Sequence, residues 1–343
     1  MRSYVESAGG EGWSGRENHE AFGRWVLLPR VLAGVNRVRL ESRLLDDDVR
    51  APIFVAPMAY QGLLHPDGER GTARAAAAAG VLMTLSTLST DSLEAVAATR
   101  PAGPRWFQLY LQPSWRRTEA LVRRAERAGY SAIVLTADVP VLGMRDAQLR
   151  TGFAVDATVP VGNGPSVAPP PRQPEWSGTK FERDSSIVES WEVVDRLRRA
   201  SRLPIVVKGI LSARDAREAV RHGARAVVVS NHGGRQLDRV PAPLDVLPEV
   251  VGAVGRKVEV YLDGGVRRGS DALIALALGA RAVGVGRPVL WALAADGTRG
   301  VQRYLELLTS ELATALFLIG RSRISDIHRS LVRRSGARGS ADP

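Results

Sequence analysis

The chain has 343 residues, of which 45% are hydrophobic, enough to bury one barrel-sized core or two smaller ones. It contains no cysteine, which excludes disulfides and thiolate metal sites. The formal net charge of +11 favours anionic ligands, but the basic residues are spread along the chain without a nucleic-acid motif, so we expect no nucleic-acid partner. The sequence has neither a signal peptide nor an apolar run of the roughly 18 residues that span a membrane, which predicts a cytoplasmic protein without a membrane partner.

The chain divides into an irregular start and a regular remainder. Residues 1–50 form an N-terminal extension with a short helix expected over 18–28 and a strand-rich segment over 35–49. Apolar strand candidates then follow at 52–57, 81–86, 104–110, 131–138, 204–209, 225–231, 258–264 and 281–286. Helices are expected between them at 67–79, 91–99, 114–128, 212–222, 244–254 and 270–278.

Strands that are apolar throughout and alternate with helices indicate a parallel sheet covered on its outside. Eight such strands predict a closed (β/α)₈ TIM barrel over 51–320, within a single domain of residues 1–343. Residues 321–343 form a C-terminal tail in this prediction. A doubly wound open sheet is the alternative.

One connection departs from this regularity. Residues 143–187 follow the fourth strand and include the proline-rich stretch 159–176. Long loops in compact domains are usually functional or disordered, and this loop leaves the strand end at which barrel active sites lie. We therefore interpret it as a mobile active-site lid.

Polar residues gather where the predicted strands end. They are Ser86, Thr87, Gln108, Tyr110, Thr136, Asp138, Lys208, Ser230, His232 and Asp263. Catalytic groups of TIM barrels come from these ends. A neutral imidazole at His232 can accept a proton, and the guanidinium of Arg235 can bind a carboxylate through two hydrogen bonds. A loop histidine beside a solvated arginine is the alternative.

The last two strands are followed by glycine and arginine. Residues 263–267 read DGGVR, and residues 284–288 read GVGRP. Glycine lets backbone amides approach phosphate oxygens, and the loops after strands seven and eight are the usual phosphate site of a TIM barrel. The chain has no paired metal ligands and no GxGxxG fingerprint after an early strand. These features favour FMN, with its ring over the barrel mouth.

The sequence resembles the FMN-dependent α-hydroxy acid oxidase and dehydrogenase family, which includes glycolate oxidase, lactate oxidase and mandelate dehydrogenase. The resemblance rests on SNHGGRQLD (230–238), LDGGVRRG (262–269), GRPV (286–289), LPIVVKG (203–209), WFQLY (106–110) and the aspartate of LTADVPVLGMR (135–145). It implies an FMN-dependent (S)-2-hydroxy-acid oxidase and, from the family's common state, a homotetramer.

The resemblance also implies roles for individual residues. His232 would be the base, Asp138 would hold its imidazole, Tyr110 would bind the substrate hydroxyl, and Lys208 would stabilise negative charge on the flavin. Tyr4, Arg145 and Arg235 would bind the substrate carboxylate. Contacts to FMN are implied for Ala59, Ser86, Gln108, Thr136, Lys208, Ser230, Asp263, Gly265, Arg267, Gly286 and Arg287. The other histidines, His19, His65, His222 and His328, carry no motif and are expected at the surface or at helix ends.

The substrate is predicted from one departure. Glycolate oxidases carry a tryptophan where this chain has Leu88, and a leucine leaves room for a larger acid. Residues 55–69 and 84–94 are also most similar to hydroxymandelate oxidases. We therefore expect an aryl 2-hydroxy acid such as mandelate or 4-hydroxymandelate, with O₂ reduced to H₂O₂. The alternatives are a dehydrogenase that uses a quinone or protein acceptor, and an FMN-binding barrel with a maturation or binding role.

Overall fold

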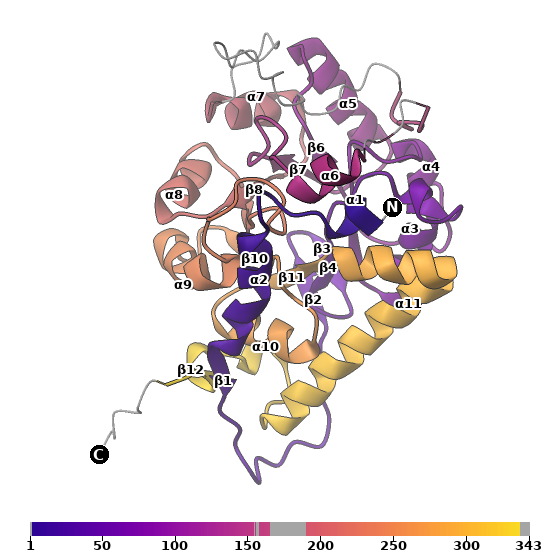
Figure 1. Ribbon diagram of the computed structural model, residues 1–343. Coiled ribbons are helices and arrows are strands. Elements are labelled where there is room, and N and C mark those ends of the chain that lie inside the picture. Colours follow the sequence, from indigo (N-terminus) through magenta and orange to yellow (C-terminus); the bar gives the residue numbers. More distant parts are fainter. Residues whose placement is uncertain (1, 154, 156–157, 165–189, 337–343) are drawn as a thin grey trace.

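The computed structural model describes residues 2–153, 155, 158–164 and 190–336. Its centre is a closed barrel of eight parallel strands in the order β10-β11-β4-β5-β6-β7-β8-β9 (Figure 1). The strands are β4 (Ile53–Val55), β5 (Leu82–Leu85), β6 (Arg105–Leu109), β7 (Ala132–Thr136), β8 (Ile205–Ile210), β9 (Ala226–Val229), β10 (Glu259–Asp263) and β11 (Ala282–Val285). Because β11 pairs with β4, the sheet closes. The predicted TIM barrel is confirmed, and the open sheet is wrong.

Helices surround the barrel. They are α3 (Gly68–Ala79), α4 (Leu93–Ala97), α5 (Trp115–Arg127), α7 (Glu192–Ala200), α8 (Ala213–Arg221), α9 (Pro243–Val254), α10 (Gly269–Ala277) and α11 (Arg287–Leu318). Neither α7 nor α11 was predicted from the sequence. The backbone of α11 is non-helical at Asp296 and Gly297, and Figure 1 shows its two halves running in different directions.

The N-terminal extension corrects one prediction. The expected helix over 18–28 is instead α2 (Trp13–Gly23), which follows a short α1 (Arg2–Glu6). Asp238 fixes the start of α2, because its carboxylate accepts hydrogen bonds from the backbone amides of Trp13 and Ser14 at 3.3 and 2.8 Å. The chain leaves the helix to form β1 (Trp25–Leu27), which pairs antiparallel with β12 (Val332–Arg334). The pairing of β1 with β12, some 300 residues away in the sequence, therefore overrides the helix propensity of residues 25–27.

The end of the barrel opposite the active-site face is closed by a hairpin. It consists of β2 (Ser42–Leu44) and β3 (Asp47–Val49), which confirms strands within 35–49. Side chains of this hairpin pack under the aromatic residues Phe54, Trp106 and Tyr261 inside the barrel. A larger apolar layer lies between the strands and the helices. The barrel is thus a filled core with one usable open end.

The C-terminal region also packs on the barrel. It contains the short helices η2 (Ile324–Asp326) and η3 (Arg329–Leu331) before β12, and Leu331 and Val332 are buried. Residues 321–334 of the predicted tail are therefore part of the fold. Within the described residues no helix is long and apolar enough to cross a membrane.

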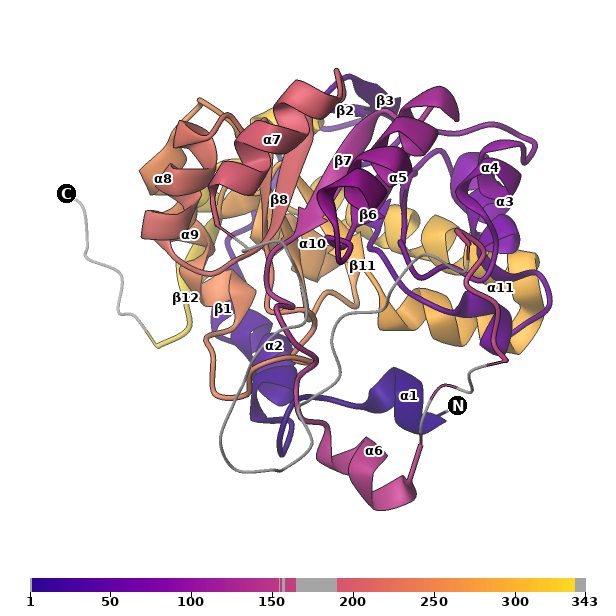
Figure 2. The same cartoon turned by 90° about the horizontal axis from the view of Figure 1, so that it is seen from above.

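The open end of the barrel is where the carboxyl ends of the strands meet. Segments from outside the barrel gather there, and Figure 2 shows α1 beside α6 (Asp146–Thr151). A further short helix, η1 (Gln61–Leu63), follows β4 at the same end. Residues 154, 156–157 and 165–187 of the predicted lid lie outside the described residues, so its mobility stays a prediction.

Candidate active site

A cavity of about 850 Å³ opens at the carboxyl ends of the barrel strands. Every residue predicted to bind substrate or cofactor or to catalyse lines this cavity, except Asp138 and Ser230, which contact residues that do. The predicted positions come from all parts of the chain. Their convergence follows from the barrel, because parallel strands present all their carboxyl ends on one face.

His232 and Asp138 form a hydrogen-bonded pair. The imidazole Nδ1 lies 3.1 Å from Asp138 Oδ1, and the His232 backbone is held in the left-handed region at φ 59°. The backbone amide of His232 donates to Ser230 Oγ at 3.1 Å, which supports this conformation. The loop therefore turns the imidazole out of the strand direction and toward the cavity.

The charges of this pair suit a general base. Burial lowers the pKa of His232 and outweighs the opposing attraction of Asp138. Burial alone would raise the pKa of Asp138, but the charges of His232 and Lys208 and the hydrogen bond from His232 hold it below its usual value. An ionised carboxylate can only accept, so Nδ1 carries the proton and Nε2 is left as the basic nitrogen.

Lys208, on β8, lies near the pair formed by His232 and Asp138. Its side chain is 5% exposed, and Nζ lies 2.9 Å from Ser230 Oγ and 3.5 Å from Asp263 Oδ2. Burial opposes the charged form, but the carboxylates of Asp263 and Asp138 raise the pKa of Lys208 above its ordinary value. A fixed positive charge is therefore held at the wall of the cavity.

A row of polar side chains crosses neighbouring strands next to this charge. Gln108 accepts from Ser86 Oγ at 3.2 Å and donates to Thr136 Oγ1 at 3.0 Å. All three side chains are buried and line the cavity. Such a row of donors and acceptors suits the polar edge of a planar heterocycle.

Arg267 and Arg287 lie at the end of the cavity formed by the loops after β10 and β11. Burial and the nearby positive charges of Arg235 and Arg267 lower the pKa of Arg287 to about 9. In the described part of the chain their guanidinium groups donate to backbone carbonyls, Arg287 to those of Val5, Gly233 and Ser7 and Arg267 to that of Val266, and neither is paired with a carboxylate. This end of the cavity is built for an anion.

His19 is a residue of this end that the sequence analysis did not select. It is exposed, as expected, but its Nδ1 lies 3.1 Å from the carbonyl oxygen of Gly265, and its Nε2 lies 3.0 Å from Arg267 Nη2. Sequence spacing could not predict this contact between His19 and Arg267, because α2 and the loop after β10 are separated by more than 200 residues.

A second cationic group lies near His232. Arg145 Nε donates to the carbonyl of Arg235 at 3.3 Å, and the Arg235 guanidinium lies 5.3 Å from the ring centroid of Tyr4. Arg235 also donates through Nη1 to the carbonyls of Tyr4 and Ser7. Burial and the charge of Arg235 lower the pKa of Arg145 to about 10. Two such cations beside two phenols, Tyr4 and Tyr110, can bind a carboxylate and a hydroxyl.

The remaining wall is apolar and partly unexpected. Leu88, as predicted, lines the cavity and is 6% exposed. Tyr60 and Phe153 also line it and pack against the ring of Tyr4 with centroid distances of 6.3 and 6.0 Å. Phe153 follows α6, so the described part of the predicted lid contributes to the cavity wall. The lid was predicted from the sequence, but the contributions of Tyr60 and Phe153 to the wall were not.

The donor set fits FMN. The arginines at 267 and 287 suit its phosphate, Lys208 and the row around Gln108 suit its ring, and the apolar wall leaves room for a substrate. Gly265 must be a glycine, because a Cβ there would lie 1.9 Å from the carbonyl oxygen of Asn18. At Gly286 a Cβ would meet only Met58 Sδ, at 3.8 Å, so this backbone is open toward the cavity.

Comparisons with known proteins agree with this site. Residues 1–334 match the family model of FMN-dependent dehydrogenases. The chain is 46% identical to L-lactate oxidase from Nostoc sp., over 96% of this chain and 92% of that one. It is 45% identical to 2-hydroxyacid oxidase 1 from Homo sapiens, over 93% and 88%. A solved structure of a mandelate oxidase variant with (S)-mandelic acid has a TM-score of 0.88 at 42% identity, and the match covers 98% of this chain and 94% of that one.

The chain therefore belongs to the FMN-dependent dehydrogenase family. Its cofactor is FMN, and it is an FMN-dependent 2-hydroxy-acid oxidase. The predicted family, cofactor and class of enzyme are thereby confirmed. The roles of single residues, the substrate and the electron acceptor stay predictions.

Proposed function

We propose that this enzyme oxidises an aryl 2-hydroxy acid, such as mandelate or 4-hydroxymandelate, to the 2-keto acid and reduces O₂ to H₂O₂. The observation that carries the proposal is the apolar part of the cavity wall formed by Leu88, Tyr60 and Phe153, in the same cavity as Arg145 and Arg235. A cavity that holds both FMN and an aromatic ring needs such a wall, since an aryl group is bound mainly by apolar contact.

In this proposal the substrate is held at its polar end. Arg235 and Arg145 bind the carboxylate, with Tyr4 completing the contact, and Tyr110 binds the hydroxyl. Burial raises the pKa of Tyr110, so its phenol stays protonated and available as a donor. These contacts fix the position of the substrate relative to His232. They thereby orient the C–H and O–H bonds that break in the oxidation.

His232 Nε2 takes the substrate proton. When bound, FMN would supply the redox chemistry, as the acceptor of the hydride equivalent that the substrate loses together with this proton. Asp138 stabilises the imidazolium that His232 becomes, and Lys208 holds a positive charge beside the row of Gln108. The substrate loses two electrons and two protons in total, the number that converts one O₂ to one H₂O₂.

The relatives divide over the substrate. Relatives at 44–46% identity are named for lactate, for glycolate and for 2-hydroxy acids in general, whereas the similar solved structure is a mandelate oxidase. The leucine at position 88 supports the larger substrate. The homotetramer and the cytoplasmic location stay predictions.

A panel of 2-hydroxy acids tests the proposal. The FMN-loaded enzyme is assayed in air for H₂O₂ with glycolate, lactate, mandelate and 4-hydroxymandelate. We expect the highest kcat/KM with the two aryl acids, and much faster turnover of glycolate or lactate would reject the aryl substrate. Anaerobic bleaching of the flavin by mandelate without peroxide in air would indicate the dehydrogenase instead. No bleaching by any of the acids would indicate a binding role.

A further inference from the structure

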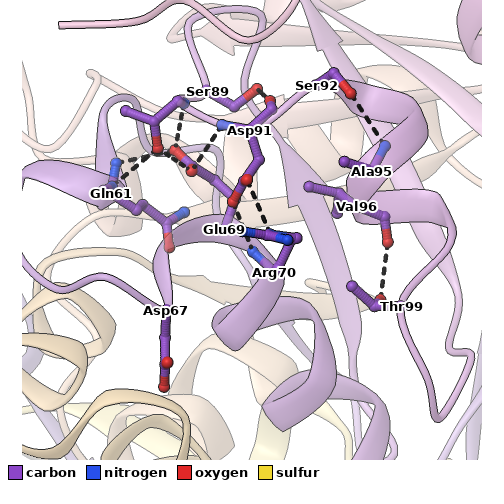
Figure 3. A network of polar contacts seen from close by, with 12 residues as sticks. Gln61, Asp67, Glu69, Arg70, Ser89, Asp91, Ser92, Ala95, Val96 and Thr99 are labelled. Carbon is purple, nitrogen blue, oxygen red and sulfur yellow. Dashed lines mark hydrogen bonds and ion pairs between the residues drawn. The ribbon is translucent and has the colours of Figure 1, made fainter.

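Glu69 is a fully buried carboxylate outside the cavity. It lies in the first turn of α3, is 0% exposed, and is absent from the residues that line the cavity. Figure 3 shows its side chain between Gln61 and Asp91, which belong to two different loops at the open end of the barrel. A buried charge of this kind is costly unless it is hydrogen-bonded, so its partners carry its role.

Four donors satisfy the two oxygens of Glu69. Oε1 accepts from the backbone amides of Gln61 at 2.9 Å and Thr90 at 3.0 Å. Oε2 accepts from the hydroxyl of Thr90 and from the backbone amide of Asp91 at 3.3 Å. Burial is the largest influence and raises the pKa of Glu69, while these hydrogen bonds oppose the rise. All four contacts are donors, so they suit a carboxylate and no neutral isostere.

The four contacts tie together the loop after β4 and the loop after β5. The link continues outward, since the backbone amide of Gly62 donates to Thr90 Oγ1 at 3.0 Å, and Gln61 accepts from Thr72 Oγ1 at 2.5 Å. Two loops that lie on neighbouring barrel strands are thereby held as one unit. Neither loop owes its position to regular secondary structure alone.

These loops carry the apolar wall of the cavity. Tyr60 immediately precedes Gln61, and Leu88 lies two residues before Thr90. The backbone amide of Tyr60 donates to the carbonyl of Leu88 at 3.0 Å, so the two wall residues are also joined directly. Tyr60 has φ of 56°, a conformation that a tyrosine keeps only when its surroundings enforce it. The hydrogen bond from Gln61 to Glu69 fixes the residue next to this strained one.

We propose that Glu69 is a positioning residue for substrate specificity, which holds Tyr60 and Leu88 where they form the binding surface for the aryl group. This inference rests on the proposed aryl substrate. Glu69 acts through the two loops and touches neither substrate nor FMN. Its loss loosens the aryl wall but leaves Arg235 and Arg145 in place, because Arg235 lies in the loop after β9 and Arg145 directly precedes α6.

The test measures binding with E69Q in the FMN-loaded enzyme. Glutamine keeps the shape of the side chain but turns an NH₂ group toward donors that then lack an acceptor. The Kd values of benzoylformate and of pyruvate are titrated through the change in the flavin spectrum. We expect the Kd of benzoylformate to rise about tenfold or more, and the Kd of pyruvate to change less than about threefold. FMN affinity, measured by flavin fluorescence, should stay at the wild-type value.

The matched control is E94Q. Glu94 makes a surface ion pair with Arg124 Nε at 2.9 Å and touches neither loop residue of the wall. We expect both Kd values to stay at wild-type levels in this variant. Two outcomes with E69Q would overturn the proposal. An equal rise in the Kd of both keto acids would indicate a general structural role for Glu69, and unchanged Kd values would indicate that Glu69 has no role in binding.

A second variant covers the case in which E69Q does not fold. T90V removes the hydroxyl donor to Glu69 and leaves the carboxylate in place, so it should weaken benzoylformate selectively and by a smaller factor. A wild-type enzyme that binds pyruvate more tightly than benzoylformate contradicts the proposed aryl substrate. The proposal for Glu69 is judged separately, by the change in the ratio of the two Kd values between wild type and variant.

Discussion

The substitution D138N separates the charge of Asp138 from its shape. Asparagine keeps an oxygen that can accept the hydrogen bond from His232 Nδ1, so the imidazole should stay in place. What disappears is the negative charge that lies 3.1 Å from that nitrogen. If His232 takes the substrate proton, the imidazolium it becomes loses its counter-charge, and the step that forms it slows.

The magnitude follows from the geometry. At 3.1 Å with an effective dielectric constant of about 20, the attraction between the two charges is roughly 5 kcal/mol. Both side chains are mostly buried, at 21% and 15% exposed, so little of this is screened by solvent. The hydrogen bond that asparagine retains recovers part of it. We expect the rate of flavin reduction by mandelate to fall by about 10²- to 10³-fold.

The assay is anaerobic stopped-flow reduction of the flavin as a function of pH. Because Asp138 acts to raise the pKa of His232, its neutralisation lowers that pKa further. The acidic limb of kcat/KM should therefore move to lower pH while the plateau falls. The control D195N neutralises the carboxylate that lies 2.6 Å from His222 Nδ1 at the surface, and it should leave both plateau and limb unchanged. A loss below tenfold in D138N, or a limb that moves to higher pH, would refute the base assigned to His232.

Three further substitutions test other parts of the site. L88W fills the space beside the aryl group, so kcat/KM for mandelate should fall by about 30-fold or more while glycolate is spared; equal effects on both acids would contradict the role of this wall. R235K replaces a fork of donors by a point charge, and the Kd of benzoylformate, followed through the flavin spectrum, should rise about 10- to 100-fold; an unchanged Kd would show that the carboxylate binds elsewhere. G265A places a Cβ 1.9 Å from the oxygen of Asn18 at φ of 93°, and it should cost about 2 kcal/mol or more of stability by thermal unfolding and weaken FMN. Its control G252A, with nothing within 4 Å of the new Cβ, should be neutral or stabilising, and a wild-type melting temperature in G265A would contradict the close packing of α2.

Local sequence patterns were enough to predict most of the barrel. Each barrel strand is an apolar run bounded by helix caps, and strand and helix periodicities differ, so eight repeats were enough to predict the closed barrel. The barrel in turn places the carboxyl ends of all its strands on one face, so the sequence alone predicts that residues such as Gln108, Lys208 and Asp263 lie together. Family resemblance then supplied roles that spacing alone does not.

The prediction stopped where contacts join distant parts of the chain. The start of α2 depends on Asp238, more than 200 residues later, and β1 depends on β12. The contact of His19 with Arg267 and the contribution of Phe153 to the cavity wall have the same origin. None of these leaves a periodic signal in the sequence, because one partner of each pair is an ordinary residue in its own segment.

The sequence by itself determined the barrel, the cofactor and the group of residues at its open end, since strand polarity forces those ends together. Only the tertiary structure decided how the substrate side of the cavity is built. Its wall includes Tyr60, which has a left-handed backbone and precedes Gln61, whose backbone amide donates to the buried carboxylate of Glu69. Hydrogen bonds between loops leave no periodic pattern in the sequence. They can be identified only from the tertiary structure, in which the two loops are neighbours.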